Sequence, residues 1–165
     1  MIFIQENMVF AHQLDVSCKK QLLTSLSKIM LQHVQTGVSD TDEAVLALAT
    51  QLMQREHLGS TAIGRGVAMP HCVSADTDYV LCCIATSKRP IAFDAADGRH
   101  VDLFGILLLP EALAHTAPAH LERLKQILTK RGLRSRLKSA SSHSELKSVF
   151  INSDATPAAT GQKAA

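Results

Sequence analysis

The chain has 165 residues, of which 46% are hydrophobic and 19% are charged. This is enough apolar material for one core and excludes a wholly disordered polypeptide, so we expect a single domain. Seventeen Lys and Arg residues against fifteen Asp and Glu residues give a net charge of +2, too small to imply binding to nucleic acid or to an anionic membrane. The apolar runs are far shorter than the roughly 18–20 residues that a membrane span needs.

The N-terminal segment and the cysteines indicate the compartment. The first residues, MIFIQENMVF, carry no basic leader and no sustained apolar stretch, and Cys18, Cys72, Cys82 and Cys83 form no CxxC pair. We therefore expect a soluble cytoplasmic protein whose cysteines are reduced thiols that fill the core. A metal site built from His71, Cys72, Cys82 and Cys83 is disfavoured, because adjacent strand residues such as Cys82 and Cys83 point to opposite faces. No cofactor is predicted.

Two helices are predicted first along the chain. Apolar residues recur at spacings of three and four from Ser17 to Val34, which is typical of an amphipathic helix. A second helix is predicted from Asp40, where Glu43 three residues later completes a capping box, and its apolar positions run on to Met53.

Strands follow in the middle of the chain. The segment GSTAIGRGVAMPH predicts a short hairpin that turns around Gly64–Arg65–Gly66. Residues 79–86 and 101–109 are nearly continuous apolar runs, which indicates central strands covered on both faces.

Helical periodicity returns at residues 121–128, and a short helical stretch is predicted at 133–140. Ser142 and Glu145 then introduce a last helix. The main elements, two helices, four strands and two helices, predict an α/β (α+β) fold with a central mixed sheet sandwiched by helices. We assign residues 1–152 to this domain and residues 153–165, which are small and polar, to a disordered tail.

The chemistry is concentrated between Arg55 and His71, in REHLGSTAIGRGVAMPH. Three glycines within eight residues leave backbone amides accessible to an anion. Pro70 prevents a central strand from simply continuing, so His71 is predicted at a strand end with its ring within reach of the surface. Such an imidazole can serve as a base, a metal ligand or a nucleophile toward phosphorus, and the alternative is a structural histidine beside a proline.

Two further residues fit phosphoryl transfer, which needs positioning and positive charge. His120 falls in the first turn of the helix that carries Leu124 and Ile127, where the helix N-terminus favours an anion. Arg55 offers a guanidinium fork for phosphate oxygens. The alternatives are a packed or capping histidine and a salt-bridged arginine at a helix end.

Three segments, REHLGSTAIGRGVAMPH, RPIAFDAADGRHVDLFGILLLP and HLERL, occur in the order and spacing of a known family. Across roughly Leu14 to Ile151 the chain resembles the type-2 enzyme IIA domain of the bacterial phosphotransferase system, the mannitol/fructose class. The family fold is a mixed sheet flanked by helices. This chain differs from the family's pattern at two positions. It has Cys72 where the family often has glycine, and His57 where Lys or Ala is common.

The resemblance implies roles for three residues. His71 would be the phosphorylated histidine, which receives its phosphoryl group from a histidine-containing phosphocarrier protein. His120 would stabilise that group without carrying it, and Arg55 would be the arginine near the active site. The protein would then act as a phosphotransferase through a phosphohistidine intermediate.

The resemblance leaves two branches of the family as alternatives, which use the phosphohistidine differently. The segment LDVSCKKQLLTSLSKIM resembles the stand-alone nitrogen-regulatory branch, whose phosphorylation state controls other proteins. The alternatives are a sugar-specific IIA component that passes phosphate to a IIB component, and a binding module that works without phosphorylation.

A basic segment lies near the C-terminal end of the domain. Seven cations fall within sixteen residues, namely Arg123, Lys125, Lys130, Arg131, Arg134, Arg136 and Lys138. The segment contains no aromatic residue for stacking on bases, so nucleic-acid binding is disfavoured. It is interpreted as a solvated face, or else as a surface that steers an acidic partner protein.

Overall fold

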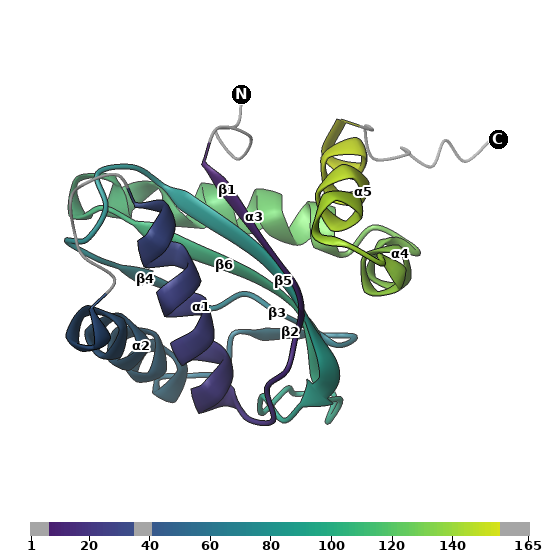
Figure 1. Ribbon diagram of the computed structural model, residues 1–165, viewed down its shortest axis with the longest axis horizontal. Helices are drawn as coiled ribbons and strands as arrows, with labels where there is room; N and C mark the ends of the chain where they lie inside the picture. The colour runs from purple at the N-terminus through teal and green to yellow at the C-terminus, as the bar shows by residue number, and fades with distance from the viewer. Residues whose placement is uncertain (1–6, 35–40, 156–165) are drawn as a thin grey trace, which may run out of the picture.

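The computed structural model describes residues 7–34 and 41–155, which form a mixed sheet between two layers of helices (Figure 1). The strands are β1 (Met8–Leu14), β2 (Ala62–Gly64), β3 (Val67–Ala68), β4 (His71–Val73), β5 (Leu81–Ile91) and β6 (Val101–Leu109). The helices are α1 (Lys19–His33), α2 (Asp42–His57), the 3₁₀ helix η1 (Glu111–Thr116), α3 (Ala117–Leu128), α4 (Leu133–Ser139) and α5 (His143–Ala155). The predicted fold class is confirmed. No helix within these two ranges is long and apolar enough to cross a membrane.

The sheet is built around β5 and β6, which pair antiparallel in its centre. Strand β1 pairs parallel with β5, and β3 pairs parallel with β6, giving the order β1-β5-β6-β3-β2. Strand β4 lies on the same edge of β6 as β3. Because β6 is buried throughout its length, it is the rigid element against which the shorter strands are positioned.

Each face of the sheet has its own apolar core, as the alternation of side chains along a strand requires. Helices α1 and α2 cover one face, with Leu26 and Leu48 fully buried among the sheet residues there. Helices α3, α4 and α5 cover the other face, where Leu124 and Phe150 are fully buried. Cys82 lies in the second core and Cys83 in the first, so their predicted opposite orientations are confirmed.

The predicted order lacked two strands. Strand β1 precedes the first helix, and β4 follows the β2–β3 hairpin. The hairpin itself is confirmed, since β2 and β3 pair antiparallel on either side of Arg65 and Gly66. Both missed strands are defined by parallel pairing with residues far away in the sequence, which no local pattern announces.

Two helix boundaries differ from the predictions. Helix α2 is capped by Thr41, whose hydroxyl oxygen accepts a hydrogen bond from the backbone N–H of Ala44 at 3.3 Å, whereas the predicted cap, Asp40, lies outside the described residues. Helix α5 runs to Ala155, so residues 153–155 are helical and not part of a disordered tail. Residues 156–165 lie outside the described part of the chain.

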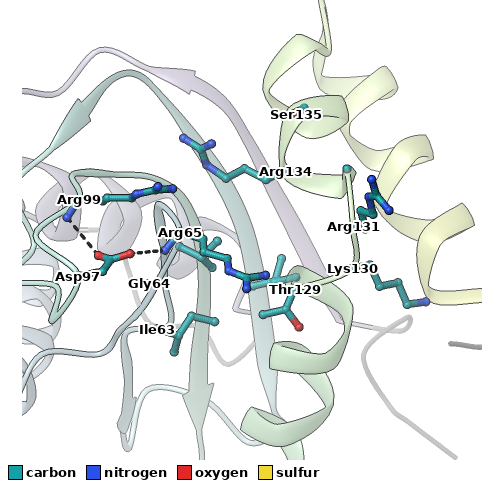
Figure 2. A pocket seen from close by; sticks show the side chains of 13 residues that line it. Ile63, Gly64, Arg65, Asp97, Arg99, Thr129, Lys130, Arg131, Arg134 and Ser135 are labelled. Atoms are coloured by element: carbon teal, nitrogen blue, oxygen red, sulfur yellow. Dashed lines mark hydrogen bonds between the residues drawn. The ribbon is translucent and has the colours of Figure 1, made fainter. Parts of the chain in front are cut away.

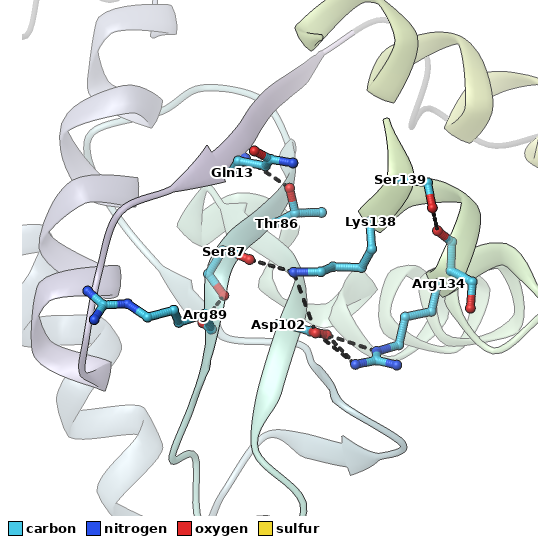
Figure 3. Close-up of polar contacts among 9 residues, drawn as sticks. Gln13, Thr86, Ser87, Arg89, Asp102, Arg134, Lys138 and Ser139 are labelled. Carbon is cyan, nitrogen blue, oxygen red and sulfur yellow. Dashed lines mark hydrogen bonds and ion pairs between the residues drawn. The ribbon is translucent and has the colours of Figure 1, made fainter. Parts of the chain in front are cut away.

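The basic segment is only partly a solvated face. Arg134 donates two hydrogen bonds of 2.8 Å to the carboxylate of buried Asp102, which Lys138 also approaches to 3.5 Å (Figure 3). Arg123 pairs with Asp154, and the ammonium group of Lys130 donates to a backbone carbonyl of α5. These four cations fasten α3, α4 and α5 together and to the sheet, while Lys125, Arg131 and Arg136 are exposed.

Candidate functional site

His71 is the first residue of β4, immediately after an interruption in the edge of the sheet. The carbonyl of Pro70 accepts a hydrogen bond from the N–H of Leu107, but the proline has no N–H to donate in return. The register with β6 is nevertheless the same in β3 and β4, because Ala68 lies opposite Phe104 and His71 opposite Leu107. His71 therefore keeps a fixed place on a half-buried edge, as its sequence context predicted.

Hydrogen bonds to both nitrogens orient the His71 ring. The Nδ1 atom lies 3.0 Å from the backbone carbonyl oxygen of Met69, an acceptor, so Nδ1 carries the proton. The Nε2 atom then has a lone pair, and it accepts a hydrogen bond of 3.3 Å from Nε of Arg55. Arg55 also donates from Nη1 to the carbonyl of Gly59 at 3.1 Å, which fixes the guanidinium beside the ring. The structure thus brings together two of the three predicted site residues.

Several groups determine the pKa of His71, and their net effect is a value below the ordinary 6.5. Burial of the ring is the largest cause, because it disfavours the charged imidazolium, and the positive charge of Arg55 acts in the same direction. The hydrogen bond to the Met69 carbonyl and the carboxylate of Glu56 oppose these effects. The ring is therefore neutral at pH 7 and its Nε2 lone pair is available for reaction.

Glu56 is part of the site although the sequence analysis did not select it. Its side chain is buried, and its two carboxylate oxygens accept hydrogen bonds from the N–H of Thr61 at 2.7 Å and from the Thr61 hydroxyl at 2.6 Å. These bonds join the end of α2 to the start of the hairpin, which helps to hold Arg55 beside His71. The signal was present, because Glu56 occupies a position of the α2 stripe formed by Val45, Leu48 and Leu52.

His120 lies in the first turn of α3, as predicted, and its ring is buried. Burial lowers the pKa of His120 from its ordinary value. The residue lines a mainly apolar pocket of about 390 Å³ beside Tyr79 and Val80, a pocket that neither His71 nor Arg55 lines. Leu107, the register partner of His71, packs in the same core as α3, so His71 and His120 share one face of the sheet.

Three of the four cysteines are buried, as predicted, and Cys18 is the exception. Burial raises the pKa of the Cys72 thiol to about 12 and that of Cys82 to about 12, so both remain protonated. Cys18, in contrast, is exposed, and its assignment to the core was wrong. Within the described ranges no three His, Cys, Asp or Glu side chains are grouped as metal ligands.

Comparisons with known proteins identify the family to which this domain belongs. Residues 2–153 match the family model "Phosphoenolpyruvate-dependent sugar phosphotransferase system, EIIA 2". The chain belongs to this type-2 EIIA family, and the predicted family membership is confirmed.

The most informative relatives carry one name. The chain is 32% identical to a nitrogen regulatory protein of Pseudomonas aeruginosa over 137 residues, which cover 81% of this chain and 83% of the relative. It is 31% identical to a nitrogen regulatory protein of Escherichia coli over 140 residues, covering 84% and 82%.

Solved structures agree with these relatives. The nitrogen regulatory protein IIA-Ntr of Neisseria meningitidis superposes with a TM-score of 0.69 at 28% identity, over 86% of this chain and 92% of that one. The mannitol IIA of Escherichia coli superposes with a TM-score of 0.67 at 14% identity, over 91% and 99%, and shows likeness of fold alone.

Proposed function

We propose that this protein is a phosphocarrier and regulator in which Nε2 of His71 accepts a phosphoryl group from a histidine-containing phosphocarrier protein. The observation that carries the proposal is the pairing of the ring, whose Nδ1–H is held by the Met69 carbonyl while Nε2 faces the guanidinium of Arg55. Membership of the EIIA 2 family supports the reaction class.

The transfer exchanges one nitrogen–phosphorus bond for another. The lone pair of Nε2 forms a bond to phosphorus while the bond between phosphorus and the donor's histidine nitrogen breaks, and that electron pair returns to the donor's ring. No proton has to leave His71, because the ring starts neutral and keeps the proton on Nδ1. The ring becomes positively charged, so its hydrogen bond to the Met69 carbonyl strengthens as the product forms.

Arg55 and His120 supply positioning and charge. Charge on the transferring group is spread over its equatorial oxygens, and a guanidinium fixed beside Nε2 is placed to meet them. His120 stabilises the phosphoryl group from the first turn of α3 without carrying it, as the family resemblance implies. Replacing Arg55 with Gln should slow the transfer by about 10²-fold, the typical effect of losing one such donor.

The phosphorylation state then controls other proteins. The phosphoryl group carries a charge of about −2 at pH 7 beside the positively charged ring, which changes the partners that a surface accepts. Relatives named nitrogen regulatory proteins align over most of their own length, which favours control of nitrogen or other metabolism over sugar uptake.

Intact-mass measurement tests the acceptor. The purified protein is incubated with phosphoenolpyruvate and the general phosphotransferase components, and we expect an acid-labile gain of about 80 Da, one phosphoryl group. His71→Ala should abolish the gain, whereas His100→Ala, at an exposed histidine outside the site, should not change it. His120→Ala should label more slowly or hold the group less persistently. An unmodified wild-type protein would indicate a binding module that works without phosphorylation.

A sugar-specific IIA component is the second candidate. It is favoured by 32% identity over 110 residues to the "PTS system 2-O-alpha-mannosyl-D-glycerate-specific EIIABC component" of Escherichia coli, of which the match covers 16%. Mixing the phosphorylated protein with purified IIB domains separates the two candidates. Rapid loss of the label to one IIB domain would replace the regulatory proposal with sugar phosphorylation.

A further inference from the structure

A second pocket, lined by many polar side chains, lies away from His71 at the end of the sheet where β6 begins. It measures about 1010 Å³ and is walled by three separate segments, namely the β2–β3 turn, the loop before β6, and the junction of α3 with α4 (Figure 2). Val67 is the residue of β3 that lines it, and four residue steps of extended chain, about 13 Å, lead from Val67 to His71. The pocket is therefore distinct from the phosphoryl site.

Five cationic side chains surround this pocket, at Arg65, Arg99, Lys130, Arg131 and Arg134. The three at positions 65, 99 and 131 are exposed and form no salt bridge with any residue of the described ranges. Asp97 is the one acidic side chain in the lining, and its carboxylate is directed at backbone groups. It accepts hydrogen bonds of 2.8 Å from the N–H of Arg65 and 3.1 Å from the N–H of Arg99. The net side-chain charge around the pocket is therefore positive, although Arg134 is paired with Asp102 and Lys130 donates to the carbonyl of Ser153.

Arg65 occupies a strained position in the turn that carries it. Gly64, Arg65 and Gly66 have φ values of +87°, +56° and +80°, and only the middle residue bears a side chain. An arginine in the left-handed region costs of order 1–3 kcal/mol relative to ordinary backbone. Glycine at position 66 is also needed for space, because an added Cβ would lie 2.7 Å from Nε of Arg134.

We infer that this pocket binds a small anion that carries two or more phosphate groups. Guanidinium groups bind phosphate oxygens in a bidentate way, and arginines from three segments around one pocket suit a compact ligand with several charges. A concave site of this volume is of the size that encloses a small molecule, whereas a protein partner presents a broad, flatter surface. The pocket gives Arg131, one of the exposed cations of the basic segment, a role.

Isothermal titration at about 0.15 M salt, where exposed charges are screened, tests the inference with sodium tripolyphosphate as the probe. Tripolyphosphate should bind at one site, and inorganic phosphate should bind at least tenfold more weakly. Arg131→Gln should weaken tripolyphosphate binding about tenfold. The matched control Arg136→Gln removes the same charge from the same basic segment outside the pocket, and it should change the affinity less than twofold.

Three results would overturn the inference. These are no saturable binding of tripolyphosphate, equal weakening by Arg131→Gln and Arg136→Gln, and tighter Arg131-dependent binding of poly-glutamate than of tripolyphosphate. The last would assign the surface to an acidic protein. His71→Ala should bind tripolyphosphate as the wild type does, so failure of the phosphocarrier proposal and failure of this one are separately visible.

Discussion

At the scale of single residues, the orientation of one imidazole determines the chemistry. The Met69 carbonyl holds the proton on Nδ1 of His71 and leaves the Nε2 lone pair, the nucleophile that we propose, beside Arg55. Both side chains could be predicted from the sequence, but the ring nitrogen with the free lone pair could not. That detail depends on a backbone carbonyl two residues earlier, whose direction is determined only when β4 pairs with β6.

The lowered pKa of His71 predicts a specific dependence on pH. Because the folded-state pKa lies below the ordinary 6.5, the unfolded chain takes up this proton first as the pH falls. His71 should therefore reduce the free energy of unfolding as the pH drops from above 6.5 through the folded pKa, and have no effect at higher pH. An NMR titration of the ring should give a midpoint below 6.5, and His71→Gln should remove this part of the pH dependence. A midpoint above 6.5 would contradict the geometry.

Glu56 affects both the stability of the fold and the pKa of His71. Glu56→Gln should destabilise the fold by about 1–3 kcal/mol, since the buried hydrogen bonds to Thr61 are weakened. It should also lower the pKa of His71 further, because the carboxylate now raises it. Thr61→Val is the matched control, as it removes one of the same hydrogen bonds but keeps the charge. Chemical denaturation and NMR titration of both variants check this, and an equal pKa for His71 in both would show that the charge of Glu56 is not felt at the ring.

At the scale of elements, local patterns predicted the helices and the hairpin, and nonlocal pairing decided the rest. The period of 3.6 in α1 and the glycine-rich turn after β2 are properties of short segments, which is why they were predicted. Strand β4 has only three residues and follows a proline, so only its pairing with β6 makes it a strand. The end of α5 was missed for a similar reason, because Asp154 is held by Arg123 of α3.

The carboxylate of buried Asp102 contributes to the attachment of α4 to the sheet. Asp102→Asn should leave Arg134 and Lys138 without their counter-charge and should lower the free energy of unfolding by about 2 kcal/mol, a value reduced for the partial exposure of both cations. Asp15→Asn provides the control, because the ion pairs of Asp15 are exposed and are worth about 0.5 kcal/mol or less. Urea denaturation measures both changes, and equal effects would mean that Asp102 is no more important than a surface charge.

At the scale of the whole molecule, the net charge of +2 concealed an uneven distribution. Four cations of the basic segment hold helices in place, while three arginines around the second pocket form no salt bridge within the described ranges. The linear sequence showed the cluster from Arg123 to Lys138 but not that Arg65 and Arg99 join it, because the fold brings those segments together (Figure 2). His71, the proposed phosphoryl acceptor, and the cationic pocket thus lie at different places along β6, the central strand.

The most direct measurement of the central claim identifies the nitrogen that bears the phosphoryl group. The protein, labelled with ¹⁵N in its histidines, is phosphorylated by the general phosphotransferase components, and long-range ¹H–¹⁵N spectra are recorded. We expect one phosphohistidine, His71, with phosphorus on Nε2 and the proton retained on Nδ1. Phosphorus on Nδ1 of His71, or on His120, would contradict it.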